Sequence, residues 1–410
     1  MIEECDIVVI GAGPAGLAAA WAASQSGRRV TILDDNPSAG GQIWRCGLPP
    51  VWEDRIRNRA IEFRACVSVV GLHQPGSLLT VKDDRASILS FRKAILCTGA
   101  RERFLPFPGW TLPNVFGAGG LQAMVKHGAP ITGKRVVVAG SGPLLLAVAA
   151  YLKQRGARVL CIAEQARPRI LRRFKKALFR EPRKLAQAIT LRWALLGVPY
   201  RADCWIMAAT GAEKLEAVTL RSGGKRREIK CDYLACGYGL VPSTELAAVM
   251  GCRVDTGMVV VNHWQETTQQ GVYCAGESTG IGGGDLALVE GSIAGYAAGG
   301  QQDRARALFR SREKANRFRR LLESTFRLRA ELASLATPET ILCRCEDVPL
   351  GKLSEHRSWR DAKLQTRCGM GPCQGRICGP AAEFLLGWPA ESIRPPIFPV
   401  CVKHLLNDPS

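Results

Sequence analysis

The feature that most constrains this chain is the glycine turn GAGPAG at residues 11–16. An apolar run at 6–10 comes before the turn, and an alanine-rich run at 17–26 follows it. A second short apolar run at 29–33 completes the pattern. Short buried strands on either side of a helix predict a parallel βαβ unit of the kind that binds dinucleotides.

The residue types in this turn have distinct physical roles. Gly11 permits the tight turn, Gly13 lets the backbone approach a pyrophosphate, and Gly16 lets the helix pack closely on the strand. The exposed N–H groups and the dipole of the helix attract phosphates. Acidic residues at the end of the next strand hydrogen-bond a ribose. The predicted nucleotide-binding residues of this unit are Gly11, Gly13, Pro14, Ala15, Gly16, Asp34 and Asp35.

A second copy of the pattern begins at residue 135. The run VVVA at 136–139 precedes Gly140 and Gly142, and we expect a helix at 144–154 and a strand at 158–162. Leu145 takes the third glycine position, where its side chain is expected to push the helix from the strand or to narrow the cleft. Glu164 can still hold a ribose. The ligand of this fold stays open between NAD(P), an adenine nucleotide such as ATP, and no ligand.

The remaining segments set the domain organisation. A chain of 410 residues exceeds what one core usually spans, so two or three units are expected. A strand, a glycine loop and a small-residue helix at 271–299 return the chain to the first fold, so the second fold is inserted in the first. The prediction is an α/β protein with two Rossmann-like folds and a small helical module. Its domains are 1–115 with 255–303, the inserted fold at 116–254, a basic helical connector at 304–337, and a cysteine-rich module with the tail at 338–410.

The cysteine-rich module carries the sharpest chemical signal. Cys343 and Cys345 form a CxC pair, and Cys373 and Cys378 form a CxxxxC pair further along the chain. Four thiolates from two short loops are the usual holder of a 2Fe-2S cluster, and nearby glycines leave backbone N–H groups free to donate to the sulfurs. These four are the predicted metal ligands, with Cys368 ranked behind Cys373. Tetrahedral zinc is the alternative, although structural zinc sites favour CxxC or longer pairs.

Composition narrows the setting and the partners. Sixteen cysteines without an export signal favour a metal or redox cofactor in a reducing, cytoplasmic compartment over a disulfide scaffold. No apolar run approaches the length of a membrane span. The net charge of +20 suggests nucleic acid, but no DNA- or RNA-reading motif is present, so we expect no nucleic-acid partner. The basic runs at 166–184 and 304–330 are expected to be solvated faces, with an acidic partner or peripheral membrane association left open.

Three further motifs resemble those of the two-dinucleotide-binding-domain flavoproteins. The segments AGE at 275–277 and GGG at 282–284 resemble the family's carboxy-terminal flavin motif, with Glu where Asp is usual. LCTGA at 96–100 is similar to another flavin-side turn, and GGQ at 40–42 to a loop near the isoalloxazine. The resemblance implies FAD in the first fold. The flavin-binding residues that it adds are Gly41, Gln42, Thr98, Gly99, Ala100, Gly276, Glu277 and Gly283.

The cysteine module, with its string GMGPCQGRICGP, resembles the 2Fe-2S domain of bacterioferritin-associated-ferredoxin-like (BFD-like) proteins. Together with the strings at 100–115 and 139–152, nearly the whole chain resembles the alpha (A) subunit of opine oxidases, D-hydroxyproline dehydrogenases and hydrogen cyanide synthase. The resemblance implies a beta subunit that is an FAD amine oxidase-like dehydrogenase and oxidises a C–N bond. In some relatives it also implies a small gamma subunit with another 2Fe-2S cluster and an FMN at a subunit interface.

These observations favour an oxidoreductase that acts on CH–NH donors as part of a complex. The chain would relay electrons from the beta subunit through FAD and a 2Fe-2S cluster, and it would need no catalytic residue of its own. The alternative is an NAD(P)H-dependent FAD reductase that delivers electrons through the same cluster. A third interpretation is a redox-responsive binding module. The sequence leaves the substrate open among opines, D-hydroxyproline, proline and glycine.

Overall fold

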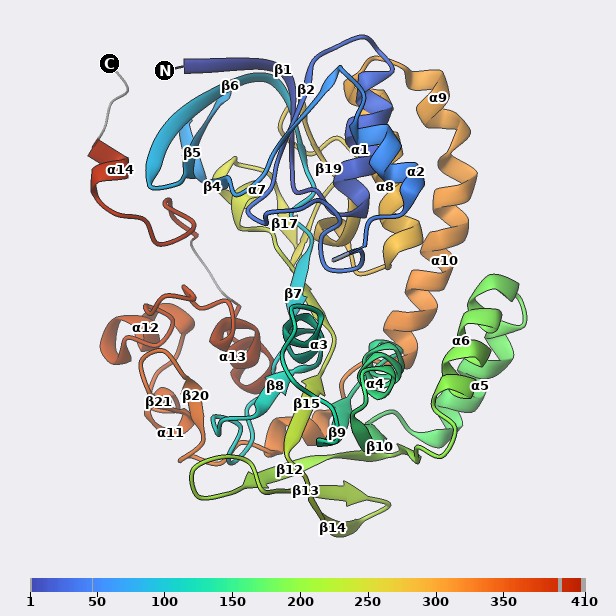
Figure 1. Cartoon of the computed structure of the whole chain (residues 1–410). Coiled ribbons are helices and arrows are strands. Elements are labelled where there is room, and N and C mark those ends of the chain that lie inside the picture. Colours follow the sequence, from blue (N-terminus) through green and yellow to red (C-terminus); the bar gives the residue numbers. More distant parts are fainter. Residues whose placement is uncertain (1, 46, 390–392, 407–410) are drawn as a thin grey trace. The chain divides into compact units, whose positions relative to one another are not determined.

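The computed structural model describes residues 2–45, 47–389 and 393–406, which divide into two compact units (Figure 1). Unit 1 takes its described residues from 1–101, 241–320 and 392–410, and unit 2 takes its residues from 102–240 and 321–391. The first segment of unit 2 thus interrupts unit 1 in the sequence. Residues 390–392 and 407–410 of the predicted 338–410 module lie outside the described residues.

Unit 1 is built on one mixed sheet in the order β3-β2-β1-β6-β5-β4, with β19 paired to β6. The parallel members are β1 (Ile2–Ile10), β2 (Val30–Leu33), β3 (Ile61–Arg64), β6 (Arg85–Leu96) and β19 (Val272–Cys274). The antiparallel members are β4 (Ser68–Gln74) and β5 (Ser77–Lys82), and β17 (Val254–Asp255) pairs with β18 (Met258–Val259) apart from the sheet. Its helices are α1 (Pro14–Ser24), α2 (Pro50–Ile56), α7 (Glu245–Val249), η1 (Gly276–Thr279), α8 (Gly284–Ala298), α9 (Gln302–Ala307) and α14 (Lys403–Leu406).

Small residues bring the carboxy-terminal part of unit 1 onto its first helix. A Cβ atom on Gly291 of α8 would lie 2.1 Å from the carbonyl oxygen of Ala15, and one on Gly295 would lie 2.1 Å from that of Ala19. The two helices therefore pack at backbone contact, which larger side chains would prevent. This packing confirms that the strand and helix predicted at 271–299 belong to the first fold, beside the helix that follows the first glycine turn.

Unit 2 contains a parallel sheet in the order β11-β10-β9-β15-β8. Its strands are β8 (Val115–Gly117), β9 (Arg135–Gly140), β10 (Arg158–Glu164), β11 (Tyr200–Ala202) and β15 (Tyr233–Gly237). A second, antiparallel sheet contains β12 (Cys204–Thr210), β13 (Ala217–Ser222) and β14 (Lys225–Lys230). The helices of this part are α3 (Ala118–Lys126), α4 (Leu144–Gln154), α5 (Pro168–Leu178) and α6 (Pro182–Ala194). The two predicted βαβ units are thus confirmed at the level of their elements.

The cysteine-rich segment of unit 2 has a small core of its own. This core includes Leu342, Leu353, Trp359 and three cysteines. The elements of the segment are η2 (Ala330–Ser334), β20 (Ile341–Cys343), β21 (Val348–Pro349), α11 (Leu350–Leu353), α12 (Trp359–Thr366) and α13 (Cys378–Leu386). Three further elements cross the limits between the units, namely β7 (Ala100–Glu102), β16 (Leu240–Pro242) and α10 (Phe309–Thr325).

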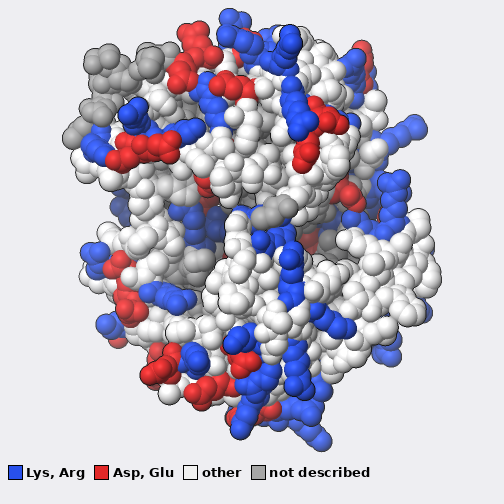
Figure 2. Space-filling model, in the orientation of Figure 1, with Lys and Arg blue, Asp and Glu red and all other residues white. Residues whose placement is uncertain are grey.

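The basic runs of the sequence form exposed helices. In α5, α6, α9 and α10 nearly all Lys and Arg side chains are exposed or half-buried, as expected for solvated faces. Figure 2 shows more Lys and Arg than Asp and Glu on the face drawn. Phe179 and Trp193, at the ends of α5 and α6, are also exposed. Within the part of the chain that the structure describes, no helix combines the length and apolar character that crossing a membrane requires.

Candidate functional site

The first glycine turn lies between β1 and α1 and leaves no room for a side chain at Gly11 or Gly16. A Cβ atom on Gly11 would lie 2.2 Å from the carbonyl oxygen of Cys97, and one on Gly16 would lie 1.8 Å from that of Gly11. Gly13 precedes α1 and gives it no side-chain cap, and Pro14 begins the helix. The first N–H groups of α1 therefore have no side-chain cap and are available to an anion.

A second loop lies against this turn. The Gly40 N–H donates to the carbonyl of Ala12 at 2.8 Å, and a Cβ atom on Gly41 would lie 2.9 Å from the Cα of Gly13. The backbone of Gly40 and Gly41 therefore contacts the backbone of the glycine turn directly, beside the start of α1. Gln42, which was predicted with this loop, is exposed.

Asp34 supports the turn directly. One carboxylate oxygen accepts from the N–H of Ala12 at 2.5 Å, and the other accepts from the N–H of Asn36 at 2.8 Å. The side chain is buried, whereas that of Asp35 is exposed and accepts from the Asn36 side-chain amide at 2.8 Å. The predicted ribose acid therefore also fixes the conformation of the glycine turn, which the sequence pattern alone does not reveal.

The other two predicted flavin segments lie beside each other and beside the turn. The hydroxyl of Thr98 donates to the carbonyl of Ser243 at 2.6 Å and lies 3.0 Å from the hydroxyl of Ser278. Ser278 in turn donates to the carbonyl of Gly99 at 3.2 Å. A Cβ atom on Gly276 would lie 2.7 Å from the Cβ of Ala15 in α1. The predicted residues from 98–100 and 276–277 are thus gathered next to the first turn of α1.

Two acidic residues, Glu277 and Glu290, lie in this part of the site. Burial raises the pKa of Glu277 above its usual range, and Gly283, with a φ of +79°, precedes α8. Sequence reasoning missed Glu290 of α8, which is buried and accepts from the N–H of Gly276 at 3.0 Å and from Thr279 at 2.9 Å. Burial raises the pKa of Glu290 to about 7. Its only signal in the sequence is an acid in the middle of a helix that is rich in small residues.

The second glycine turn has the same backbone plan with different side chains. Leu145 is fully buried, yet α4 still packs on β9 and β10. Its side chain packs in the apolar core of this fold, and a Cβ atom on Gly237 would meet Leu145 Cδ2 at an ordinary van der Waals distance of 3.5 Å. The expectation that Leu145 pushes the helix away is therefore wrong. Glu164 is also buried, and accepts from the N–H groups of Gly142 at 2.8 Å and Ala166 at 2.9 Å.

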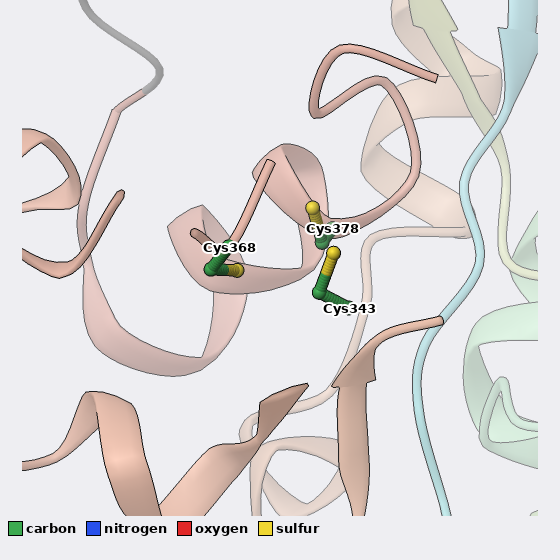
Figure 3. A group of neighbouring side chains, drawn as sticks. All are labelled: Cys343, Cys368 and Cys378. Carbon is green, nitrogen blue, oxygen red and sulfur yellow. The ribbon is translucent and has the colours of Figure 1, made fainter. Parts of the chain in front are cut away.

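The cysteine-rich segment gathers five thiols. The sulfur atoms of Cys343, Cys368 and Cys378 all lie within 4.8 Å of one another, and all three side chains are buried. Figure 3 shows these three side chains beside one another. Cys373 is half-buried, and Cys345 is exposed. Cys368, which spacing ranked behind Cys373, thus belongs to the buried group together with one member of each predicted pair.

Hydrogen bonds among these sulfurs lower the pKa values of Cys343 and Cys373 and raise those of Cys368 and Cys378. The thiols of Cys368 and Cys378 hydrogen-bond to Cys343 and lower its pKa to about 2. A hydrogen bond with Cys378, and a weaker one with Cys345, help lower the pKa of Cys373 to about 5. The N–H of Gly369 also donates to the sulfur of Cys343 at 3.5 Å. A group that stabilises thiolates in this way has the chemistry of a soft-metal site.

Comparison with known proteins identifies the family to which this chain belongs. The model of the family described as pyridine nucleotide-disulphide oxidoreductase matches residues 5–298. The chain belongs to this family. It is also 31% identical to the A subunit of opine oxidase from Agrobacterium tumefaciens strain Ach5, over 98% of this chain and 92% of that protein. It is 31% identical to the HcnB subunit of hydrogen cyanide synthase from Pseudomonas aeruginosa, over 90% of each chain.

A solved structure shares the fold of this chain. L-proline dehydrogenase from P. horikoshii superposes with a TM-score of 0.68 at 20% identity, covering 99% of this chain and 81% of that one. The chain is thus an oxidoreductase of the pyridine nucleotide-disulphide oxidoreductase family, related to the A subunit of opine oxidase. The fold of this family implies FAD binding, and the bare backbone around Gly13 and Gly41 fits a pyrophosphate.

Proposed function

We propose that this chain is the flavin and iron–sulfur electron-transfer subunit of a hetero-oligomeric amino-acid or opine dehydrogenase. Electrons would come from an FAD-containing beta subunit, in which the substrate is oxidised. Two curated relatives that are similar over nearly the whole chain are named as subunits, of opine oxidase and of hydrogen cyanide synthase. These names support a partner subunit but do not fix the substrate.

The observation that carries the proposal is the group of buried cysteines, because a flavoprotein that only reduced a soluble acceptor would not need it. Two of its members come from the CxC pair and the CxxxxC pair, and Cys345 and Cys373 adjoin them. Zinc prefers sites in which its four ligands come from CxxC or longer pairs. We therefore propose a 2Fe-2S cluster in a BFD-like module, held by Cys343, Cys345, Cys373 and Cys378, with Cys368 as the competing ligand.

The residues around each proposed cofactor have definite tasks. In the first fold, Gly11, Gly13 and Gly16 keep the backbone bare, and Asp34 holds the turn in place. The flavin-side residues would be those predicted at 41–42, 98–100 and 276–283. When bound, FAD accepts electrons in pairs and releases them singly, and an iron–sulfur cluster carries them one at a time. In the cysteine module, the Gly369 N–H donates to a sulfur, which raises the potential of a cluster.

No residue of the chain is proposed as a general base or nucleophile. The buried acids of the first fold, Asp34 and Glu290, are both occupied with backbone N–H groups. The reacting carbon would therefore lie on the partner. A gamma subunit, an interfacial FMN and a cytoplasmic location stay predictions from the resemblance and the composition.

The test is a cofactor analysis of anaerobically purified protein with a matched pair of variants. We expect one FAD and about two irons with two acid-labile sulfides per chain. Cys378→Ser should lose the iron and keep the flavin. Cys161→Ser, at a buried cysteine remote from the group in sequence, should keep both. Zinc in place of iron, or full iron in Cys378→Ser, would contradict the cluster. Oxidation of an amino acid or opine by the chain alone would contradict the relay.

A further inference from the structure

The segment that follows α10 crosses the second glycine turn. We call residues 326–329 the strap. The hydroxyl of Ser141, inside the turn, donates to the carbonyl of Phe326 at 3.0 Å. The side-chain amide of Gln165 donates to the carbonyl of Arg327 at 3.1 Å. Two main-chain carbonyls of the strap therefore accept hydrogen bonds from residues at the position where a nucleotide would bind.

The ring of Phe326 covers the glycine that a pyrophosphate needs. A Cβ atom on Gly142 would lie 3.9 Å from Cγ of Phe326, so the ring is at van der Waals distance from this position. The ring also packs edge-on against Phe174 of α5, with centroids 5.2 Å apart. The second glycine of such a turn must stay bare for the backbone to approach the phosphates. Here the ring of Phe326 occupies the space through which a pyrophosphate would approach Gly142.

The ribose end of the site is closed as well. Glu164 and Gln165 are both 0% exposed. Both carboxylate oxygens of Glu164 accept from main-chain N–H groups, and Gln165 bonds Ser141 at 2.9 Å as well as the strap. A ribose hydroxyl needs an acceptor that it can reach. Because both side chains are fully buried, neither offers one.

Arg329 anchors the far end of the strap. Its guanidinium pairs with Asp203 and with Glu331, at 2.6 Å for Glu331, and lies 4.4 Å from the ring centroid of Trp205. Charge-assisted bonds of this kind are about twice as strong as neutral ones, and the stacking adds to them. The side chain of Arg329 is 14% exposed, whereas those of Asp203 and Glu331 are 34% and 43% exposed, so solvent partly screens these ion pairs.

We infer that the strap takes the place of the dinucleotide in the second fold, with Phe326 over the pyrophosphate position and the backbone of 326–327 across the ribose corner. The family name implies a pyridine nucleotide, and the second fold of this chain does not fit one. NAD(P)H and ATP would both be excluded. Electrons could then not enter from NAD(P)H, which argues against the alternative of an NAD(P)H-dependent reductase. The inference does not depend on the proposed relay.

The first test is direct binding to the FAD-loaded chain, and to its complex with any partner that copurifies. NADH and NADPH are titrated by the change in their own fluorescence, and ATP by equilibrium dialysis. We expect no saturable binding up to about 1 mM, the upper end of ordinary KM values. Saturable binding of any of the three at one per chain would overturn the inference. Because fluorescence and dialysis do not use the flavin, a missing cofactor cannot imitate the expected result.

The second test asks whether the strap is seated in solution. The side chain of Arg327 is exposed, but its carbonyl accepts from Gln165, so we expect trypsin to cleave after Arg327 faster when the strap detaches. Arg329→Met should speed this cleavage about tenfold or more, because it removes the ion pairs and the stacking that hold the strap. Arg226→Met, at an exposed position of β14, is the matched control and should leave the rate unchanged. Equally fast cleavage of the unmodified chain and Arg329→Met would show a detached strap and overturn the inference.

Discussion

The two glycine turns of this protein share a backbone plan and differ in what lies over them. At the first turn, the neighbour of Gly13 is the equally bare backbone of Gly41. At the second, the neighbour of Gly142 is the ring of Phe326. Each turn also has a buried acid that accepts from one of its N–H groups, namely Asp34 and Glu164. The acid and the glycines therefore build the turn in both folds. The two folds differ in the segment that lies over the turn: in the first fold it leaves the predicted ligand site bare, and in the second it fills the corresponding space with Phe326.

The largest expected difference comes from the third position of each turn. In Gly16→Ala the new Cβ would lie 1.8 Å from the carbonyl oxygen of Gly11, so α1 cannot keep its place. We expect loss of bound FAD and more than ~3 kcal/mol of destabilisation. Leu145→Ala only empties packed volume, so we expect a cost of ~2–4 kcal/mol with the FAD content unchanged. Flavin absorbance and urea unfolding measure both effects. Full FAD content in Gly16→Ala would break the comparison.

A smaller contrast is expected at the two buried acids. Asp34→Ala releases the N–H of Ala12 and removes the predicted ribose acceptor, so FAD affinity should fall by roughly 10- to 100-fold. Glu164→Ala should leave FAD affinity unchanged, because no nucleotide is expected in its fold. Titration of the apoprotein with FAD, followed by flavin fluorescence, gives both constants. Equal losses of FAD affinity in Asp34→Ala and Glu164→Ala would contradict the proposal that only the first fold binds a nucleotide.

The stability of the two folds should depend on pH in the same way. Burial raises the pKa of Glu164 and of Glu290 from 4.5 to about 7. Between these values the folded chain holds protons that the unfolded chain releases, so stability falls as pH rises through this window and levels off above it. Each acid should contribute ~1–3 kcal/mol to the fall. Glu164→Gln and Glu290→Gln, which resemble the protonated acid, should each flatten the profile in urea unfolding. An unchanged slope would show that burial does not govern these groups.

The smallest effect should appear at Gly237, which lies between Ala118 and Leu145. A Cβ atom on Gly237 would meet Ala118 Cβ at 3.2 Å, a tight contact, and Leu145 Cδ2 at 3.5 Å, an ordinary van der Waals distance. Gly237→Ala should therefore cost ~1 kcal/mol by overpacking against Ala118. In the Leu145→Ala background most of this cost should remain, which a double-mutant cycle in urea measures. A cost that vanishes in that background would show that Leu145, and not Ala118, sets the limit.

Local patterns were sufficient to predict the repeated units and their order. The strands and helices around residues 6–33 and 135–162 follow from apolar periodicity and from glycine and proline signals, which act over short stretches of chain. The gathering of the flavin segments also follows, because strands that end at one edge of a parallel sheet place their loops together.

Contacts between distant segments could not be predicted in the same way. Phe326 stands in a basic stretch whose periodicity predicts only a helix, and nothing near it in sequence indicates Gly142. Leu145 likewise lies near Gly237, which is distant from it in the sequence. Cys368 was ranked by loop spacing, whereas the packing around Trp359 and Gly369 brings it to Cys343. In each case tertiary packing decides the outcome.

The leucine of the second glycine turn bears on how relatives of this protein are sorted. A search that scores three glycines along one stretch of sequence would discard the second fold as damaged, although α4 still packs on β9 and β10. The surrounding apolar core accommodates the larger side chain. Recognition of such folds would improve if an apolar residue were accepted at the third glycine position.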